Sequence, residues 1–154
     1  MTKTVNLFSK PQKGFGLLEV LITVVILSIG LLGLAGLQAT GLSFNQSAYQ
    51  RSQATIMAYD IIDRMRVNPA AIDSYRTAIA APTDGCTLTA GCTPVQMAQN
   101  DILEWNTSLI SVFGPLASGT ITFATPIYTV DITWDENRDG DNTNDPNFLV
   151  SFQP

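Results

Sequence analysis

The sequence contains no histidine and only two cysteines, and charged residues make up only 14% of its 154 residues. Histidine is the most common general base and the most common zinc ligand, so its absence excludes Ser-His-Asp and Cys-His catalysis. Hydrophobic residues make up 45%, which excludes a disordered acidic chain and fits about one domain. We recognise no catalytic constellation and expect a protein that is not an enzyme.

The few charges are unevenly distributed along the chain. Three lysines precede Gly14 and none follows it, whereas all 13 acidic residues lie at or after Glu19. Residues 70–154 hold ten acids and two arginines, a formal charge of −8. This asymmetry predicts that the basic N-terminal end stays in the cytoplasm and that the acidic end is exported. An acidic body also matches a phosphate backbone poorly, so we expect no nucleic-acid partner.

One long hydrophobic run dominates the N-terminal part. Residues 20–37, VLITVVILSIGLLGLAGL, carry no charge. Extended back to Phe15, the run is long enough to cross a hydrocarbon core of ~30 Å, where it must be a helix. Residues 38–67 contain no proline, so we expect one helix from about residue 15 to 67, ended by Asn68-Pro69.

The second half of this helix carries two apolar patterns. One repeats every seven residues and the other follows the helical i, i+3, i+4, i+7 spacing; both are predicted to lie on the globular head. They consist of Leu42, Tyr49 and Ile56, and of Ala58, Ile61, Ile62 and Met65. The neighbouring DRMR charges predict an Asp60–Arg64 pair and a weaker Asp63–Arg66 pair on a solvated helix face. Docking of another subunit is the alternative for these charges.

Glu19 lies inside the apolar stretch. A carboxylate in lipid costs up to ~3 kcal/mol near the bilayer centre, and therefore needs a partner. The obvious partner is an α-amine produced by cleavage before Phe15. The alternative is a shallow position from which Glu19 reaches the lipid headgroups.

Residues 13–19, KGFGLLE, resemble the type III signal of type IV prepilins. That signal is a basic leader ending in Gly, followed by Phe, by Glu as the fifth residue of the mature chain and by a hydrophobic helix. The resemblance implies cleavage between Gly14 and Phe15 by prepilin peptidase and N-methylation of Phe15. Gly16 stands where the family often has Thr. A secretory signal cleaved near residues 35–39 is the alternative, which Glu19 disfavours.

A closer resemblance links the chain to minor pilins of the PilV type. It is carried by LSIGLLGLAGLQ at 27–38 and AYDIIDRMRVNP at 58–69. It implies a subunit that primes type IV pilus assembly and supports twitching motility or adhesion, with Glu19 pairing with the Phe15 amine of a neighbouring subunit or its own. A minor pseudopilin of a type II secretion system is the alternative. A DNA-uptake pilin is disfavoured by the acidic head.

The resemblance also implies partners, location and domains. The partners are other minor pilins, the major pilin, prepilin peptidase, the inner-membrane assembly platform and, before assembly, membrane lipid. The location is the bacterial inner membrane, with the N-terminus cytoplasmic and the head periplasmic, and afterwards the pilus. We expect a leader (1–14), a transmembrane or pilus-core helix (15–38), a helical stalk (39–68) and a globular periplasmic head (69–154).

The head is predicted to be of the α+β class, with the long helix packed on a second helix and a three-stranded antiparallel sheet. A short helix is expected after Ala70, ending near Ala80, and turns are expected at 82–85 and 90–91. Cys86 and Cys92 are expected to form a disulfide in the oxidising periplasm. Strands are predicted at 120–123, 128–134 and 148–152 from their alternating pattern.

The second helix has clear start and stop signals. Thr93 is a candidate N-cap, Pro94 the first helical residue and Gln96 the capping-box partner, while Gly114-Pro115 ends the helix. The predicted apolar face consists of Ala98, Ile102, Trp105 and Leu109, widened by Ile110 and Phe113.

The segment DENRDGD contains the pattern D-x-N-x-D-G, formed by Asp135, Asn137, Asp139 and Gly140 and followed by Asp141. This pattern resembles the first half of an EF-hand calcium loop. Position 12 of such a loop requires a bidentate Glu, but Pro146 stands there. We therefore expect an acidic hairpin loop and no cofactor, with calcium binding as the alternative.

Overall fold

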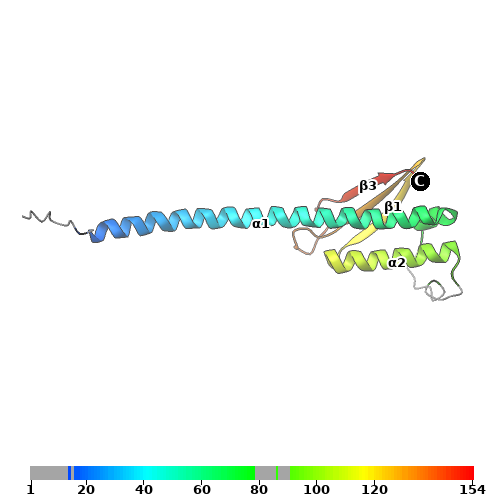
Figure 1. Cartoon of the computed structure of the whole chain (residues 1–154), viewed down its shortest axis with the longest axis horizontal. Coiled ribbons are helices and arrows are strands. Elements are labelled where there is room, and N and C mark those ends of the chain that lie inside the picture. Colours follow the sequence, from blue (N-terminus) through cyan, green and yellow to red (C-terminus); the bar gives the residue numbers. More distant parts are fainter. Residues whose placement is uncertain (1–13, 15, 79–85, 87–90) are drawn as a thin grey trace, which may run out of the picture. The chain divides into compact units, whose positions relative to one another are not determined.

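The computed structural model describes residues 14, 16–78, 86 and 91–154. Its elements are α1 (Leu17–Val67), the 3-10 helix η1 (Pro69–Arg76), α2 (Pro94–Phe113), β1 (Ser118–Ala124), β2 (Ile127–Thr133) and β3 (Phe148–Phe152) (Figure 1). The predicted α+β class, with a long N-terminal helix, a further helix and a three-stranded antiparallel sheet, is confirmed. The chain divides into two compact units, Met1–Ser43 and Phe44–Pro154, and the second is called the head unit below.

Helix α1 ends where the sequence predicts. Its last residue is Val67, and Asn68 precedes Pro69, whose ring disfavours a helical conformation at the residue before it. Glu19 lies in the first turn, and Arg64 and Arg66 lie in the last turn. Both placements are favourable in the field of the helix dipole. The expected start at Phe15 lies outside the described residues.

One face of α1 forms part of the head core. Its buried residues are Ala54, Ala58, Ile61, Ile62 and Met65, which confirms the predicted i, i+3, i+4, i+7 pattern. The seven-residue pattern was wrong as a prediction of packing on the head, because Leu42, Tyr49 and Ile56 are 69%, 63% and 61% exposed. Ile56 is two residues from both Ala54 and Ala58, which is about 200° around the helix, so the two patterns lie on opposite faces.

The connection from α1 to α2 begins with η1. This element is a 3-10 helix that ends at Arg76, so the predicted end near Ala80 was wrong for the described part. It buries Ala71 and Tyr75 against the core. The turns predicted at 82–85 and at Ala90 lie outside the described residues.

Helix α2 begins with the predicted capping box. The Thr93 side chain accepts a hydrogen bond from the Gln96 N–H, and the Gln96 side chain accepts one from the Thr93 N–H. The helix ends at the predicted Gly114, whose φ of 104° favours glycine. The predicted apolar face is buried, including Trp105 and Phe113. Ile110 is 47% exposed, so its predicted place on that face was wrong; it lies about 100° around the helix from Leu109.

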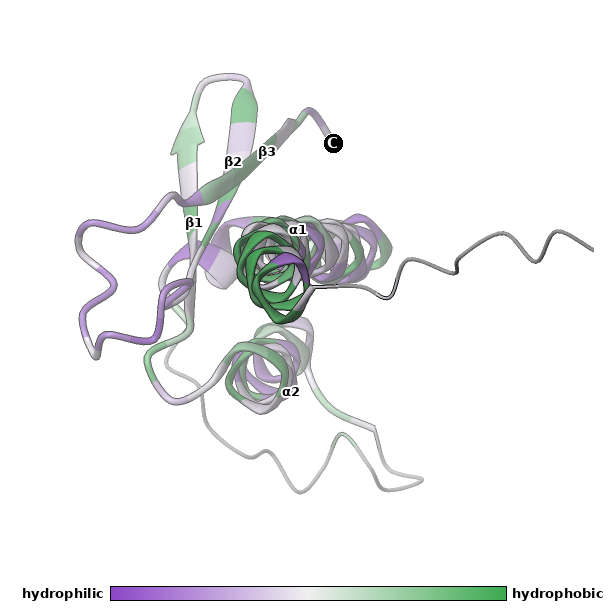
Figure 2. Ribbon diagram, turned by 90° about the vertical axis from the view of Figure 1, so that its left-hand side faces the viewer, coloured by the Kyte–Doolittle hydropathy of each residue, from purple (hydrophilic) through white to green (hydrophobic). Residues whose placement is uncertain are grey.

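The sheet has the order β1-β2-β3 with antiparallel neighbours. β1 begins two residues earlier than predicted, because Ser118 and Gly119 pair with Thr133 and Ile132. The inward residues of β2, Tyr128, Val130 and Ile132, are buried. In the end-on view of Figure 2 the sheet and α2 lie on two sides of α1. The core of the head unit therefore lies between these three elements.

Candidate functional site

The N-terminal end of α1 contains the residues of the predicted processing site. Gly14 is exposed, and Phe15 lies outside the described residues. Gly16 accepts hydrogen bonds from the N–H groups of Glu19 and Val20, at 2.9 and 3.3 Å, and so starts the helix. Glu19 is exposed and, among the described residues, its side chain has no ion-pair or hydrogen-bond partner. Its role in charge pairing stays a prediction.

The N-terminal half of α1 is long and apolar enough to cross a membrane, and no residue between 20 and 37 is buried. Its first turns are hydrophobic on almost every side in Figure 2. The polar side chains within it are satisfied by the helix itself: Thr23 donates to the Val20 carbonyl at 2.8 Å, and Ser28 to the Val24 carbonyl at 2.7 Å. Such a surface is stable only in lipid or against other apolar helices.

The head-unit part of α1 also presents an apolar face to solvent. Tyr49, Ile56, Tyr59 and Val67, called the α1 stripe below, are between 52% and 81% exposed. On this face the exposed Asp60 and Asp63 separate Val67 from the other three residues. Exposed apolar side chains that share a helix face and are unused by the core are typical of an interaction site. This stripe is therefore a second candidate contact surface.

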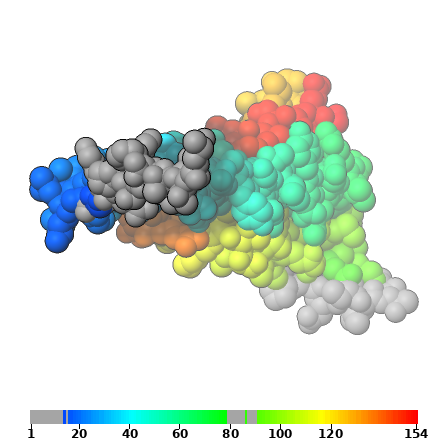
Figure 3. Space-filling model, turned by 60° about the vertical axis from the view of Figure 1, so that its left-hand side comes forward, coloured from blue at the N-terminus to red at the C-terminus, as the bar shows by residue number. Residues whose placement is uncertain are grey.

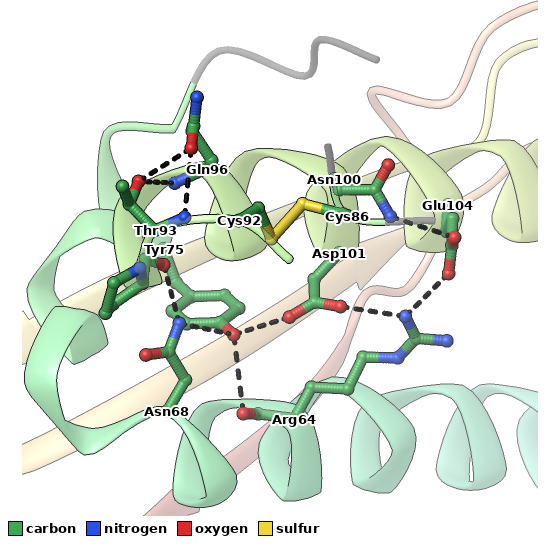
Figure 4. The surroundings of a disulfide bond; sticks show 11 residues. Arg64, Asn68, Tyr75, Cys86, Cys92, Thr93, Gln96, Asn100, Asp101 and Glu104 are labelled. Atoms are coloured by element: carbon green, nitrogen blue, oxygen red, sulfur yellow. Dashed lines mark hydrogen bonds and ion pairs between the residues drawn. A yellow bond between two sulfur atoms is a disulfide. The ribbon is translucent and has the colours of Figure 1, made fainter. Parts of the chain in front are cut away.

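The predicted charge pairs are present, but Arg64 does more than the sequence indicated. Arg64 contacts Asp60 at 3.2 Å, and the exposed Arg66 contacts Asp63 at 3.2 Å, as predicted. Arg64 also reaches helix α2, where it contacts Asp101 at 3.0 Å and Glu104 at 2.8 Å (Figure 4). The prediction of a merely solvated face was therefore wrong for Arg64, which links the two helices.

Burial lowers the pKa of Arg64, but its hydrogen bonds to Glu104 and Asp101 and the nearby charge of Asp60 outweigh that effect and raise it. The hydrogen bonds from Arg64 and Asn100 lower the pKa of Glu104. This cluster therefore stays charged across the neutral pH range and acts as a structural link.

Two further polar groups complete the cluster. The buried Asn68 amide donates to the Pro94 carbonyl at 2.7 Å and to the Tyr75 hydroxyl at 3.4 Å. The Tyr75 hydroxyl in turn donates to Asp101 at 2.5 Å. Burial and the hydrogen bond to Asp101 raise the pKa of Tyr75 well above its ordinary value. The ends of α1, η1 and α2 are thus joined by one hydrogen-bonded network.

Cys86 and Cys92 are joined by a disulfide, with their Cα atoms 4.7 Å apart. Cys92 directly precedes the N-cap Thr93, and the bond lies close to the Arg64 network in Figure 4. A disulfide here constrains the segment that leads into α2.

The acidic loop after β2 uses its own backbone as hydrogen-bond donor. Asp135 accepts from the N–H groups of Asp139 and Gly140, at 3.2 and 2.9 Å. Asn137 accepts from the Asp139 N–H at 2.8 Å, and Asp139 accepts from the Asp141 N–H at 2.9 Å. Asp141 in turn accepts from the Thr143 N–H. Among the residues described, no group of three or more His, Cys, Asp or Glu side chains is arranged to hold a metal ion.

Sequence reasoning missed the contacts that join distant segments. Beyond the Arg64 contacts to α2, Ser47 of α1 donates a hydrogen bond to Glu136 of the acidic loop. No local spacing indicates which acid on a later element faces Arg64 or Ser47. The chain has few arginines and many acidic residues, so the sequence did indicate that an arginine could have several acidic partners.

Two family models match the chain. The model described as type IV pilin Tt1218 matches residues 36–103, and the prokaryotic N-terminal methylation motif matches residues 9–35. No curated protein and no solved structure matches the chain. The methylation motif covers Gly14, Phe15 and Glu19, and the pilin model covers both cysteines and the Arg64 network apart from Glu104.

Proposed function

Because the chain belongs to the type IV pilin family, we propose that it is a minor pilin of the PilV type that primes pilus assembly and so supports twitching motility or adhesion. In this proposal it acts as a structural subunit and performs no catalysis. Its partners are the major pilin, other minor pilins, prepilin peptidase and the inner-membrane assembly platform. The resemblance at 27–38 and 58–69 supports the minor-pilin role.

The observation that carries the proposal is the apolar half of α1, which is wholly exposed and contains one carboxylate, Glu19, in its first turn. In the inner membrane, lipid covers this surface while the basic leader holds the N-terminus in the cytoplasm. In a fibre, the same surface is covered by the apolar helices of neighbouring subunits. The α1 stripe of the head unit would be a second surface that neighbouring subunits cover.

Glu19 would form an ion pair when the subunit moves from lipid into the fibre. Prepilin peptidase would cut between Gly14 and Phe15, and the new amine of Phe15, once N-methylated, would carry a positive charge. This ammonium would pair with Glu19 of a neighbouring subunit or of its own chain. In a low-dielectric core the pair is favoured over an isolated carboxylate, whose burial is costly.

The first test is the N-terminus of the mature chain. Mass spectrometry of the protein from membranes is expected to find N-methylated Phe15 as the first residue. A strain without prepilin peptidase is the control and is expected to retain residue 1–14 peptides. A mature chain beginning near residues 35–39 in the wild-type strain would contradict the proposal.

The second test separates charge pairing from helix packing. Glu19→Ala is expected to be cleaved normally and to yield few surface pili. Thr23→Ala, one turn further along and bonded only to its own helix, is the matched control and is expected to assemble normally. Normal piliation with Glu19→Ala would show that the pairing role is wrong.

A deletion strain distinguishes the minor pilin from a minor pseudopilin of a type II secretion system. Loss of surface pili and twitching, with protein secretion intact, is the expected result. Loss of protein secretion with normal pili would assign the subunit to the secretion system instead.

A further inference from the structure

The acidic loop between β2 and β3, residues 135–147, is here called the strap. It contains five acidic residues and one arginine, a formal charge of −4 (one minus five), so like charges repel one another along it. Its carboxylates accept N–H groups of the strap itself, as Asp135 does from Asp139 and Gly140. These internal bonds stabilise the shape of the strap but do not attach it to the rest of the head unit.

Two hydrogen bonds attach the strap to the helical side of the head unit, in the part of the chain that the structure describes. The hydroxyl of Ser47, on α1, donates to the Glu136 carboxylate. The Asn142 amide donates to the Leu116 carbonyl, in the turn after α2, at 2.8 Å. A further bond joins Asn147 to β2, but it lies next to the start of β3 and so holds only the root of the strap.

The strap and the C-terminal end of α2 face one another across a hollow of about 500 Å³. Arg138 of the strap and Val112 and Phe113 of α2 are among the residues that line it. Figure 3 shows the strap, in orange, next to the yellow end of α2. Phe113 stacks on Trp134, which is 1% exposed and directly precedes the strap. The strap therefore spans an apolar part of the head unit without filling the space beneath it.

The strap thus carries mutually repelling charges and is attached over an apolar surface by few bonds. Segments of this kind open before the rest of a folded protein does. The Glu136 carboxylate is half-buried, so it needs the Ser47 donor when the strap is closed and finds water when the strap is open. We propose that the strap is a conformational device, latched by these two hydrogen bonds, that opens as a unit and uncovers the C-terminal end of α2 and Trp134.

This inference goes beyond the proposed function and does not depend on it. Every residue involved lies in the head unit, and none belongs to the apolar half of α1 or to the α1 stripe. A subunit of another assembly with the same head unit would have the same strap. Failure of the strap experiment therefore leaves the minor-pilin role untouched, and failure of the deletion experiment leaves the strap untouched.

Cleavage of the folded, full-length chain by trypsin in detergent micelles tests the opening of the strap. Trypsin cuts after Lys and Arg, and Arg138 is the only such residue after Arg76. A protease cuts a folded segment only when it opens, and the rate follows the open population when reclosing is fast. Cleavage after Arg64, which links α1 and α2, is the internal reference for unfolding of the whole head unit. Mass spectrometry of the fragments measures both rates.

Ser47→Ala is expected to speed cleavage after Arg138 about tenfold, because it removes a donor to a half-buried carboxylate. Cleavage after Arg64 is expected to stay unchanged. Ser52→Ala is the matched control, since the Ser52 hydroxyl donates only within its own helix, to the Ala48 carbonyl at 2.9 Å. Ser52→Ala is expected to behave as wild type, and so is Ser47→Thr, which keeps the hydroxyl group.

The second latch is tested in the same way. Asn142→Ala is expected to speed cleavage after Arg138, and the double variant Ser47→Ala with Asn142→Ala is expected to be faster than either single variant. Chymotrypsin, which cuts after aromatic residues, reports whether Trp134 is uncovered. Its cleavage after Trp134 is expected to rise by the same factor as trypsin cleavage after Arg138.

Three results would each overturn the proposal. The first is a Ser47→Ala rate no higher than that of Ser52→Ala, which would mean that the hydrogen bond to Glu136 latches nothing. The second is an equal rise in cleavage after Arg138 and Arg64, which would mean that the whole head unit unfolds. The third is faster cleavage after Arg138 with unchanged cleavage after Trp134, because the strap would then move without uncovering the apolar surface.

Discussion

The Tyr75 hydroxyl donates a hydrogen bond of 2.5 Å to the Asp101 carboxylate, whose other oxygen contacts Arg64 at 3.0 Å. One carboxylate of α2 thus holds both η1 and the C-terminal end of α1. Tyr75 is only 2% exposed, so its neutral form is strongly favoured in the folded chain.

The raised pKa of Tyr75 predicts a loss of stability in alkali. Unfolded tyrosine ionises near pH 10 (about its ordinary value), whereas the folded Tyr75 keeps its proton to higher pH. The stability from neutral Tyr75 is therefore complete below about pH 10 and is lost as the pH rises through the folded pKa. Urea unfolding followed by tryptophan fluorescence is expected to show this decline.

Tyr75→Phe is the control for this profile and is expected to decline less steeply. A smaller decline remains, because burial and the hydrogen bond to Asp73 also raise the pKa of Tyr128. Identical alkaline profiles for wild type and Tyr75→Phe would mean that Tyr75 ionises at the same pH in the folded and unfolded chain.

Removal of the Arg64 guanidinium is expected to destabilise the head unit. Arg64→Met keeps the aliphatic stem but leaves Asp101, 13% exposed, without its cation. We expect a loss of about 2 kcal/mol in the free energy of unfolding. Asp63→Ala breaks an exposed pair and is the matched control, with an expected change within about 0.5 kcal/mol. Equal effects of the two substitutions would remove the special role assigned to Arg64.

Local sequence signals were sufficient for most elements of the fold. The Thr93–Gln96 capping box, the Gly114 stop and the alternation in 128–134 each depend on residues a few positions apart, and each appears in the structure near the predicted bounds. The family resemblance at residues 13–19 likewise depends on a short motif. Such features are fixed by backbone chemistry that neighbouring residues supply.

Contacts between distant segments were not predictable in the same way. A seven-residue repeat shows that Tyr49 and Ile56 share a face, but not whether that face meets the head or solvent. The opposite face of α1 carries the small residues Ala54 and Ala58, which let the helix approach the core closely. That face is therefore the one that is buried. The Arg64–Asp101 and Ser47–Glu136 contacts depend on where η1 and the acidic loop carry the chain.

Gly119 of β1 is expected to tolerate no larger residue. A Cβ atom at this position would overlap the Trp105 ring and lie 2.9 Å from Leu109 Cδ1. The ring cannot move freely, because its indole N–H donates to the Met57 carbonyl at 2.9 Å. Gly119→Ala is expected to cost about 3 kcal/mol in the free energy of unfolding.

The control for Gly119 is Gly41→Ala on α1, where no atom lies within 4 Å of the added Cβ. In a helix this change is expected to be neutral or to stabilise by up to about 1 kcal/mol. Urea unfolding of both variants checks the pair. A Gly119→Ala chain as stable as wild type would show that the β1–α2 packing can separate at little cost.

Calcium is expected to leave the unfolding temperature unchanged at millimolar concentration. The side chains of Asp135, Asn137, Asp139 and Asp141 accept N–H groups of their own loop, and a bound ion would have to displace several of these bonds. Thermal unfolding with and without calcium checks this, with magnesium as the control. A calcium-specific rise that Asp139→Asn abolishes would establish the loop as a calcium site.

The Cys86–Cys92 disulfide is expected to stabilise the start of α2. It closes a loop of about seven residues, for which the chain-entropy relation gives about 2.4 kcal/mol. The double variant Cys86→Ser with Cys92→Ser should lose about this much stability, and more of the loss should appear near Thr93 in hydrogen exchange, because Cys92 is adjacent to the N-cap. Chain isolated from the periplasmic side should react with a thiol-alkylating reagent only after reduction. Labelling without reductant would show that the two cysteines are free in the cell and that the capping box holds this end of α2 alone.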